Sequence, residues 1–445
     1  MIDRRARPPV RLLALSLPTL LFAGYDLARR SFLAPYLSGD LGLPIGTVGW
    51  LVMLANFASI PAEVLAGALG DRGSARIGRR APWMLGGTVL IVLAGGALLL
   101  SSGAAGVPFL ALALVGLVVG WAICNVTHGA WALEATAGAA RVQIFGLRTL
   151  FGLAGGVAFS LLAMLQAGRA PSSFVAMLLA ILVGTPLAHA LLIARAPDRP
   201  AMPHRWHRAA LIEPVRLLFV NRPNRLLAAL FALNGAHTAI TGTGYLYVVG
   251  FALALPGWGA TGIFVQTLFA AIGVVATLRL GTRIPPARLL RIILWANLLL
   301  GAALIAVPPE RPAILMLWSA LFGLVSAIDF MALRVLLGAR LDADTGAATD
   351  TTRAAAYYAG FHVPFNLCGA LGAGLLFAGY HAAGFDPRAP RGAEHAFLAV
   401  QLLPALAAIL LMAISLWILR ISAATRARPA LERPPKCLAG LSEKN

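Results

Sequence analysis

Several ionisable side chains lie inside long apolar stretches, where a charge at mid-bilayer costs about 2.5–3.5 kcal/mol on insertion scales. Asp26 is followed three and four residues later by Arg29 and Arg30, so the three side chains share one helix face. An internal ion pair accounts for this spacing. The cost of placing the pair at that depth predicts that it faces inward, next to a central cavity.

Glu63 lies in a second apolar stretch and has no cation close to it in the sequence. Desolvation disfavours the charged form of a lone buried carboxylate. Glu63 therefore suits a proton-coupling site, and a pair with an arginine on another helix is the alternative.

Trp121, Asn125 and His128 recur at helical spacing on one side of a third stretch. An aromatic ring covers the C–H face of a sugar, and an amide both donates and accepts hydrogen bonds, so this face suits a polyhydroxylated ligand. For His128 an interhelical hydrogen bond is the alternative. Arg148 offers donors to hydroxyls or a carboxylate, unless it caps a loop.

Two further polar residues lie within apolar stretches of the second half of the chain. Asp329 is mid-stretch, and Asn366 follows Pro364, which would bend a helix. The predicted substrate-binding residues are therefore Asp26, Arg30, Trp121, Asn125, His128, Arg148, Asp329 and Asn366, and the predicted cation-coupling residues are Glu63 and Asp26. No phosphate-binding loop, zinc-protease or serine-hydrolase motif occurs, so we expect no enzyme activity, no catalytic or metal site and no cofactor.

The composition determines what kind of protein must position these residues. Of 445 residues, 59% are hydrophobic and only 12% are charged, whereas soluble proteins average about 25% charged. A water-soluble domain is thus excluded. At roughly 20 residues per crossing, the sequence predicts an all-α membrane protein with twelve transmembrane helices, near 10–37, 45–70, 82–103, 107–133, 145–168, 173–196, 225–253, 259–281, 287–307, 312–340, 353–381 and 395–421.

The net charge of +19 comes almost entirely from arginines that cluster between the apolar stretches. This distribution follows the positive-inside rule and argues against a nucleic-acid partner. It predicts a multi-pass protein of the plasma (inner) membrane with both termini in the cytoplasm and the lipid bilayer around it.

The chain divides into two halves with similar patterns. Residues 1–196 and 223–421 each contain six predicted spans, residues 197–222 form a cytoplasmic linker, and residues 422–445 form a cytoplasmic tail. Each half has an arginine-rich turn after its second span, as parallel repeats would. We expect two pseudo-symmetric six-helix bundles in a monomer.

Three segments together resemble the glycoside–pentoside–hexuronide:cation symporters of the major facilitator superfamily. The first runs from Asp71-Arg72 to Gly78-Arg79-Arg80-Ala81-Pro82-Trp83, the second is Asn221-Arg222-Pro223, and the third runs from Asp342 to Arg353 and Tyr357-Tyr358. The resemblance implies the superfamily's two-bundle fold, alternating access and sugar uptake coupled to Na⁺ or H⁺. It also assigns Asp71, Arg72, Gly78, Arg79 and Arg80 to a conformational motif.

Matched position by position, the resemblance implies that Asp26 is the first-helix sugar carboxylate, Trp121 the fourth-helix aromatic residue and Arg148 the fifth-helix arginine. Glu63 matches one of two second-helix cation carboxylates. The sequence departs from the family at three charged positions, which are Ser59, Asn125 and Asn366 here. Because hard cations want charged oxygen ligands, we expect H⁺ rather than Na⁺ as the coupling ion.

The predicted function is secondary active transport, namely proton-coupled symport of a small-molecule substrate that is a sugar, glycoside or sugar acid. Two alternatives remain. One keeps the fold and exports or flips an amphiphilic lipid or drug. The other is a membrane assembly factor that transports nothing. In such a protein the carboxylates of Asp26 and Glu63 only form internal pairs.

Overall fold

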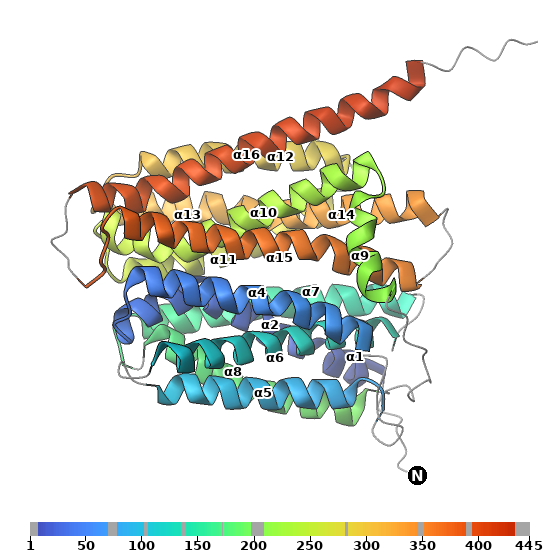
Figure 1. The fold of residues 1–445 in the computed structure, drawn as a ribbon, viewed down its shortest axis with the longest axis horizontal. Coiled ribbons are helices and arrows are strands. Elements are labelled where there is room, and N and C mark those ends of the chain that lie inside the picture. The colour runs from blue at the N-terminus through green and yellow to red at the C-terminus, as the bar shows by residue number, and fades with distance from the viewer. Residues whose placement is uncertain are drawn as a thin grey trace, which may run out of the picture.

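The computed structural model describes residues 8–69, 78–101, 106–134, 139–170, 172–196, 209–280, 284–345, 351–388 and 394–431. All regular elements in these ranges are helices. They form twelve segments that are long and apolar enough to cross a membrane, and these lie roughly parallel in one bundle (Figure 1). The prediction of an all-α membrane protein with twelve spans is confirmed.

Six spans make up the first half of the chain. Span 1 is a composite of five short segments, and spans 2 to 6 are single helices: α1 (Pro8–Ser16), α2 (Pro18–Leu27), η1 (Ala28–Phe32), α3 (Leu33–Pro35), η2 (Tyr36–Asp40), α4 (Ile45–Leu69), α5 (Ala81–Leu100), α6 (Val107–Glu134), α7 (Ala139–Gln166) and α8 (Ser173–Arg195).

The second half begins after a short helix, α9 (Ala209–Phe219), and also contains six spans. Span 7 continues into a π-helical turn and span 10 is interrupted: α10 (Arg222–Tyr247), η3 (Val248–Ala252), α11 (Trp258–Leu280), α12 (Pro286–Ile305), α13 (Pro312–Ser326), α14 (Ile328–Thr345), α15 (Thr351–Ala382) and α16 (Glu394–Leu431).

The observed helices differ from the predicted ranges mainly near the two ends of the second half. Sequence analysis did not predict α9, which lies inside the linker expected at 197–222. The last helix continues to Leu431, past the predicted end of the span at residue 421. Several spans begin with a proline in the first helical turn, for example Pro82, Pro223 and Pro286. This position suits proline, because its missing N–H has no intrahelical partner there.

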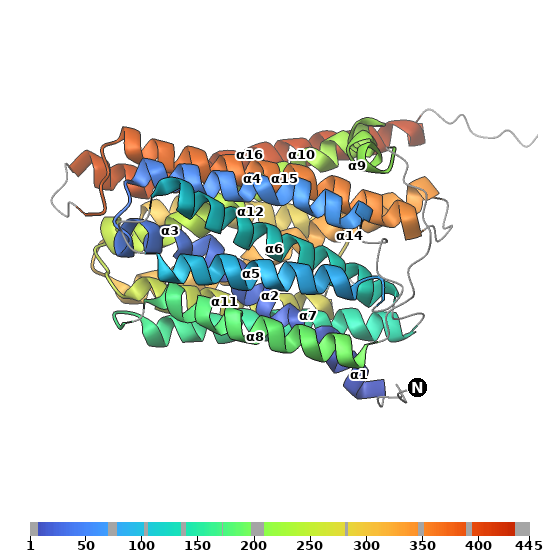
Figure 2. The ribbon, with the colours of Figure 1, turned by 60° about the horizontal axis from the view of Figure 1, so that its bottom comes forward.

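The two halves repeat the same packing scheme. In the first half α2 packs on α7 and α4 packs on α6, and in the second half the equivalent pairs are α10 with α15 and α11 with α13. The halves meet where α4 contacts α15, where α7 contacts α11, and where η1 contacts α10. In Figures 1 and 2 the helices of the two halves form adjacent groups of parallel helices. The structure is therefore a twelve-helix fold built from two related six-helix bundles.

Both ends of the described chain lie at the same end of the bundle, as an even number of spans requires (Figure 1). We term the side where α1 begins and α16 ends the terminus side, and the other the opposite side. With this definition α9 lies on the terminus side, and the turn between η2 and α4 lies on the opposite side.

Spans 1 and 7, which are equivalent in the two halves, both contain π-helical turns. In span 1 the backbone N–H of Leu33 bonds to the carbonyl of Ala28, one residue further back than in an α-helix. Pro35 lies two residues later, and proline clashes with the carbonyl four residues before it. The wider turn accommodates that clash. Such turns occur frequently at functional sites.

Close helix pairs depend on glycine at several crossings. A Cβ atom on Gly235 of α10 would overlap the carbonyl oxygen of Phe365 on α15, and one on Gly155 of α7 would overlap the carbonyl oxygen of Leu20 on α2. Small residues permit such backbone approach in membranes, where packing rather than the hydrophobic effect holds helices together. These two crossings are equivalent in the two repeats.

We expect Gly235→Ala to lower the thermal unfolding midpoint, because the helices must separate to admit the methyl group, at a cost of about 1–3 kcal/mol. Gly86→Ala is the matched control, since a Cβ there meets nothing within 4 Å and alanine favours the helix. An unchanged midpoint for Gly235→Ala would show that the crossing is looser than described. Unfolding monitored in detergent by fluorescence measures both variants.

Candidate substrate and coupling site

A group of charges lies on span 1, around the first π-helical turn. One Asp26 carboxylate oxygen is 3.0 Å from Nη2 of Arg29, and the other is 2.8 Å from Nη2 of Arg30. The three side chains keep 29%, 19% and 30% of their surface accessible, in that order. Arg29 also donates to the amide oxygen of Asn56 on α4. The ion pair expected from the spacing is thus present, and it faces another helix of the bundle.

Two aromatic rings cover this group. The Trp121 ring on α6 stacks on the Tyr25 ring with a centroid separation of 5.2 Å, and the Arg29 guanidinium lies 5.9 Å from the Trp121 ring centroid. That distance is within the range of a cation–π interaction. The Trp121 indole nitrogen and the Tyr25 hydroxyl are inaccessible and have no hydrogen-bond partner among the described residues. Buried polar groups normally have a partner, so these two atoms are exceptions among the described residues.

Three further predicted site residues of the first half, Asn125, His128 and Arg148, differ in accessibility and in their contacts. Asn125 is partly accessible. His128 is fully buried, its Nε2 donates to the carbonyl of Leu15 at 2.8 Å, and its ring contacts Phe22 edge-on. Arg148 on α7 is partly accessible and approaches the carbonyl of His128, at 3.5 Å. Along this face of α6, Trp121 therefore joins the charge group, whereas His128 holds α6 against span 1.

Glu63 and Asn366 meet at the contact between the two halves. Asn366 on α15 donates through Nδ2 to Oε2 of Glu63 on α4 at 3.0 Å. Both side chains are partly accessible. Arg29 donates to Asn56, which lies seven residues before Glu63 on α4. Arg29 thus links the ion pair on span 1 with the helix that carries the carboxylate at the interface.

Asp329 lies inside the second half, where its partners are residues of that half. Asp329 is 2% exposed and lies in the first turn of α14, just after the interruption of span 10. Its carboxylate accepts from Asn234 Nδ2 on α10 at 2.8 Å and from the backbone N–H of Phe330 at 2.6 Å. The bond from Asn234 connects α10 to α14, and the bond from Phe330 lies within α14. Asp329 therefore has a structural role.

Part of the predicted conformational motif lies outside the described residues, namely Asp71 and Arg72. Gly78 has a φ of +100°, a conformation that side chains rarely adopt. Arg79 and Arg80 follow it, and the buried Arg80 directly precedes α5. The glycine thus allows the chain to turn sharply into span 3.

Sequence reasoning missed three contributors to this site, which are Tyr25, Asn56 and the role of Arg29 as the link. Asn56 lies seven residues before Glu63, hence on the same face of α4. A polar residue at that spacing in an apolar span is a signal that could have identified it. Tyr25 gave no such signal, because an aromatic residue is ordinary in a membrane helix.

On the opposite side the two halves are joined directly. The Ser38 hydroxyl at the end of span 1 is 2.7 Å from the Tyr247 hydroxyl at the end of α10, and both are buried. Arg388, after α15, donates to the carbonyl of Gly42 at 2.7 Å. The backbone N–H and side chain of Arg388 hold the pKa of Asp386 below its usual value. Asp386 therefore stays ionised until the pH falls below its normal titration range, and this contact is expected to be insensitive to pH near neutrality.

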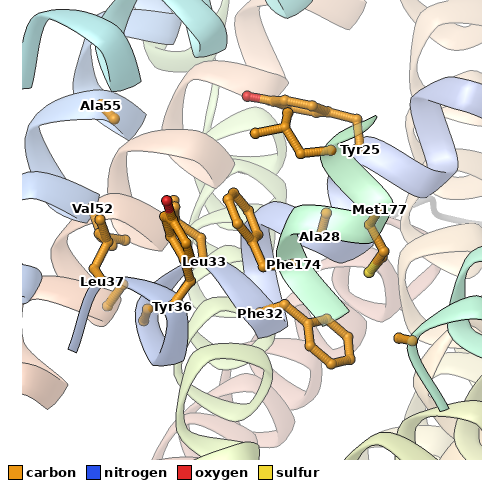
Figure 3. Close-up of a cluster of buried hydrophobic side chains, with 14 of the residues drawn as sticks. Tyr25, Ala28, Phe32, Leu33, Tyr36, Leu37, Val52, Ala55, Phe174 and Met177 are labelled. Carbon is orange, nitrogen blue, oxygen red and sulfur yellow. The ribbon is translucent and has the colours of Figure 1, made fainter. Parts of the chain in front are cut away.

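Apolar side chains fill the space between this contact and the charge group. Figure 3 shows Leu33, Tyr36 and Leu37 of span 1 beside Val52 of α4 and Phe174 of α8. The Tyr36 and Phe174 rings stack with centroids 4.7 Å apart. Span 1 is thus closed against α4 and α10 on the opposite side, whereas a cavity of about 370 Å³ lies on the same side between Tyr36 of span 1, Phe174 of α8 and Gly257 before α11.

Removing the Tyr247 hydroxyl is expected to open the opposite side more often, because a net hydrogen bond contributes about 0.5–1.5 kcal/mol. Pulsed electron paramagnetic resonance between labels at Ser101 and Glu310 should show longer distances in Tyr247→Phe. Tyr380→Phe is the matched control, since that buried hydroxyl donates to the Val400 carbonyl within the second half. Equal distance distributions in the two variants would contradict the closure assigned to Ser38 and Tyr247.

Comparison with known proteins agrees with this architecture. Three solved transporters have the same fold: a point mutant of the nucleoside transporter NupG (14% identity, 93% of this chain, 100% of that chain, TM-score 0.67), a bacterial homologue of the human lysosomal transporter Spinster (17%, 95%, 98%, 0.66) and a D-xylose–proton symporter (13%, 91%, 97%, 0.65). A search of curated protein sequences finds no match.

The twelve spans make this an integral, multi-pass membrane protein, and its fold is that of these solved transporters. The family model described as MFS/sugar transport protein matches residues 15–423, so the chain belongs to that family. The superfamily expected from the sequence motifs is thereby confirmed. A transporter of this family implies a small-molecule substrate.

Proposed function

We propose that the protein is a proton-coupled symporter of a sugar, glycoside or sugar acid, and that it works by alternating access rather than as an enzyme. The observation that carries the proposal is the hydrogen bond between Glu63 and Asn366 across the two halves, beside the Asp26–Arg29–Arg30 group. A titratable carboxylate at the surface along which the halves move links protonation to that movement.

The proton would act through the charge balance of the site. With Asp26 and Glu63 ionised, their two negative charges cancel the positive charges of Arg29 and Arg30. Protonation of Glu63 leaves one guanidinium charge uncompensated and weakens the charge-assisted bond from Asn366, since such bonds are roughly twice as strong as neutral ones. A proton would therefore loosen the contact between halves and free an arginine donor for a solute oxygen.

The solute would bind against the aromatic rings and amides beside these charges. The partly accessible Trp121 ring, which stacks on the buried Tyr25 ring, offers an apolar surface. Asn125 and the accessible part of Arg30 supply further donors to hydroxyl or carboxylate oxygens. Arg148 and His128, one turn further along, would hold the helices that form this surface.

Protons suit the site better than Na⁺. Ser59 donates to the backbone carbonyl of Asn56 at 2.7 Å, and Asn366 turns its NH₂ group toward Glu63. A hard cation needs several charged oxygen ligands, and these neighbours supply none. We further propose that the protein acts as a monomer without a cofactor, and that the terminus side faces the cytoplasm, because the arginine clusters lie there.

Solute uptake into proteoliposomes tests the function. A thermal-shift screen of neutral glycosides against uronates first identifies a ligand of the purified protein. Uptake of that ligand is then measured under an imposed pH gradient, acid outside, and separately under an imposed Na⁺ gradient. We expect accumulation with the pH gradient alone. Accumulation that depends on Na⁺ and ignores pH would overturn the proton assignment, and the absence of any stabilising sugar would overturn the substrate class.

A further inference from the structure

The short helix α9 lies across the outside of the bundle on the terminus side. It runs across the spans in Figure 1 and is seen nearly end-on in Figure 2, at the surface beside α10. It contacts α15 and α10 of the second half and α4 of the first. No role in solute binding or proton coupling involves this helix.

Hydrogen bonds and one buried side chain fix the rotation of α9 about its axis. Leu218 is 5% exposed and belongs to the hydrophobic core of the second half. Asn224 donates to the carbonyl of Leu217 at 2.9 Å, and Arg340 on α14 donates to the Asn224 side-chain oxygen at 2.8 Å. Because these contacts hold the C-terminal end of α9, the direction in which each of its other faces points is fixed.

The face turned away from the bundle is apolar. Ile212 is 63% exposed and Phe219 is 67% exposed, with the exposed Val215 between them. Their spacing of three and four residues places them in one stripe. A contiguous exposed apolar stripe marks an interaction surface.

Exposed basic side chains lie on α9 and directly after it. Arg216 is on α9, and Arg222 and Arg225 are at the start of α10; the segment 209–225 contains one acidic residue, Glu213. A helix with an apolar stripe and flanking arginines has the form of an interfacial membrane helix, whose charges attract anionic lipid.

The neighbouring surface identifies the occupant as the bilayer. On α15, which α9 contacts, Leu367, Leu371 and Leu375 are exposed, as is normal for a helix in contact with acyl chains. The helix α9 lies at the terminus-side end of this lipid-facing helix. A second copy of the chain would leave the arginine border without a counter-charge, since it would present the same cations.

We propose that α9 is a binding site for anionic phospholipids, with Ile212, Val215 and Phe219 among the acyl chains and Arg216 and Arg222 at the phosphate groups. The inference rests on the membrane class of the protein and not on the proposed solute or ion. Since α9 contacts both α4 and α15, which carry Glu63 and Asn366, the bound lipid stabilises the arrangement of the two halves described here.

The immersion of α9 can be measured with spin labels. In a variant lacking Cys124, Cys368 and Cys437, labels are placed at Ile212→Cys and Phe219→Cys, with Glu310→Cys on the opposite side as the water-exposed control. The proteins are reconstituted into phosphatidylcholine vesicles containing phosphatidylglycerol. We expect relaxation at 212 and 219 by oxygen, which dissolves in acyl chains, and relaxation at 310 by a water-soluble nickel chelate. Relaxation by nickel at 212 and 219, or shielding from both reagents by a second copy, would overturn the proposal.

The anion preference is measured without labels. Phosphatidylglycerol added to the wild-type protein in detergent is expected to raise the thermal unfolding midpoint more than phosphatidylcholine does. In the variant R216Q/R222Q, the phosphatidylglycerol content needed for half of that rise should increase about fivefold per arginine. The variant R288Q/R291Q removes two exposed arginines of α12 on the same side and should keep the wild-type response. Equal responses of the two double variants would refute a site on α9.

Discussion

Glu63→Gln is expected to abolish accumulation of the solute under a pH gradient while leaving the protein folded. Glutamine has nearly the same shape and keeps a carbonyl oxygen that accepts from Asn366, so the contact between halves persists. It cannot bind and release a proton, so the gradient has no means to drive the cycle. A gradient of two pH units supports about 100-fold accumulation in a symporter that moves one proton per solute, and the variant should fall to simple equilibration.

Exchange measurements separate loss of coupling from loss of transport. Proteoliposomes loaded with unlabelled solute should still exchange it for labelled solute through Glu63→Gln, because exchange needs no net proton movement. Glu310→Gln, which neutralises an exposed carboxylate on the opposite side, is the matched control and should accumulate solute as the wild type does. Accumulation that survives in Glu63→Gln would remove Glu63 from the coupling mechanism.

Asp26→Asn is expected to impair both stability and solute binding. The substitution leaves Arg29 and Arg30 without their shared carboxylate inside the bundle. Removing one partner of a buried ion pair costs about 3–5 kcal/mol, and the partial accessibility of these side chains places the effect toward the lower end. Thermal unfolding in detergent should show a clearly lowered midpoint, and the ligand that stabilises the wild type should no longer shift it.

The double variant Asp26→Asn/Arg30→Gln distinguishes a structural from a functional role of Asp26. It restores the local charge balance, because one positive charge is removed together with the negative charge of Asp26. We expect the unfolding midpoint to recover while ligand binding stays lost. Recovery of both would mean that Asp26 only neutralises the arginines and makes no contact with the solute.

The spans were predictable residue by residue because hydropathy is a local property. Span 3, predicted at 82–103, is observed at Ala81–Leu100, and span 6, predicted at 173–196, is observed at Ser173–Arg195. The ion pair of Asp26 with Arg29 and Arg30 was predictable for the same reason, since helical spacing alone places these side chains together. The helix α9 was not predicted, because eleven residues flanked by prolines and arginines have the composition of a linker. Its stability comes from Leu218 and Asn224 packing on other helices.

The amino-acid sequence thus determined the twelve spans and the presence of ionised groups inside them. The hydropathy of a segment and the charges within it are properties of that segment alone. The tertiary structure decided which groups meet. Glu63 and Asn366 are 303 residues apart and pair only because α4 crosses α15 at one depth and rotation. Asp329, whose position in an apolar stretch predicts only that it faces inward, is bonded to Asn234 on α10. Helix rotation and depth result from packing across the whole bundle, and no local pattern encodes them.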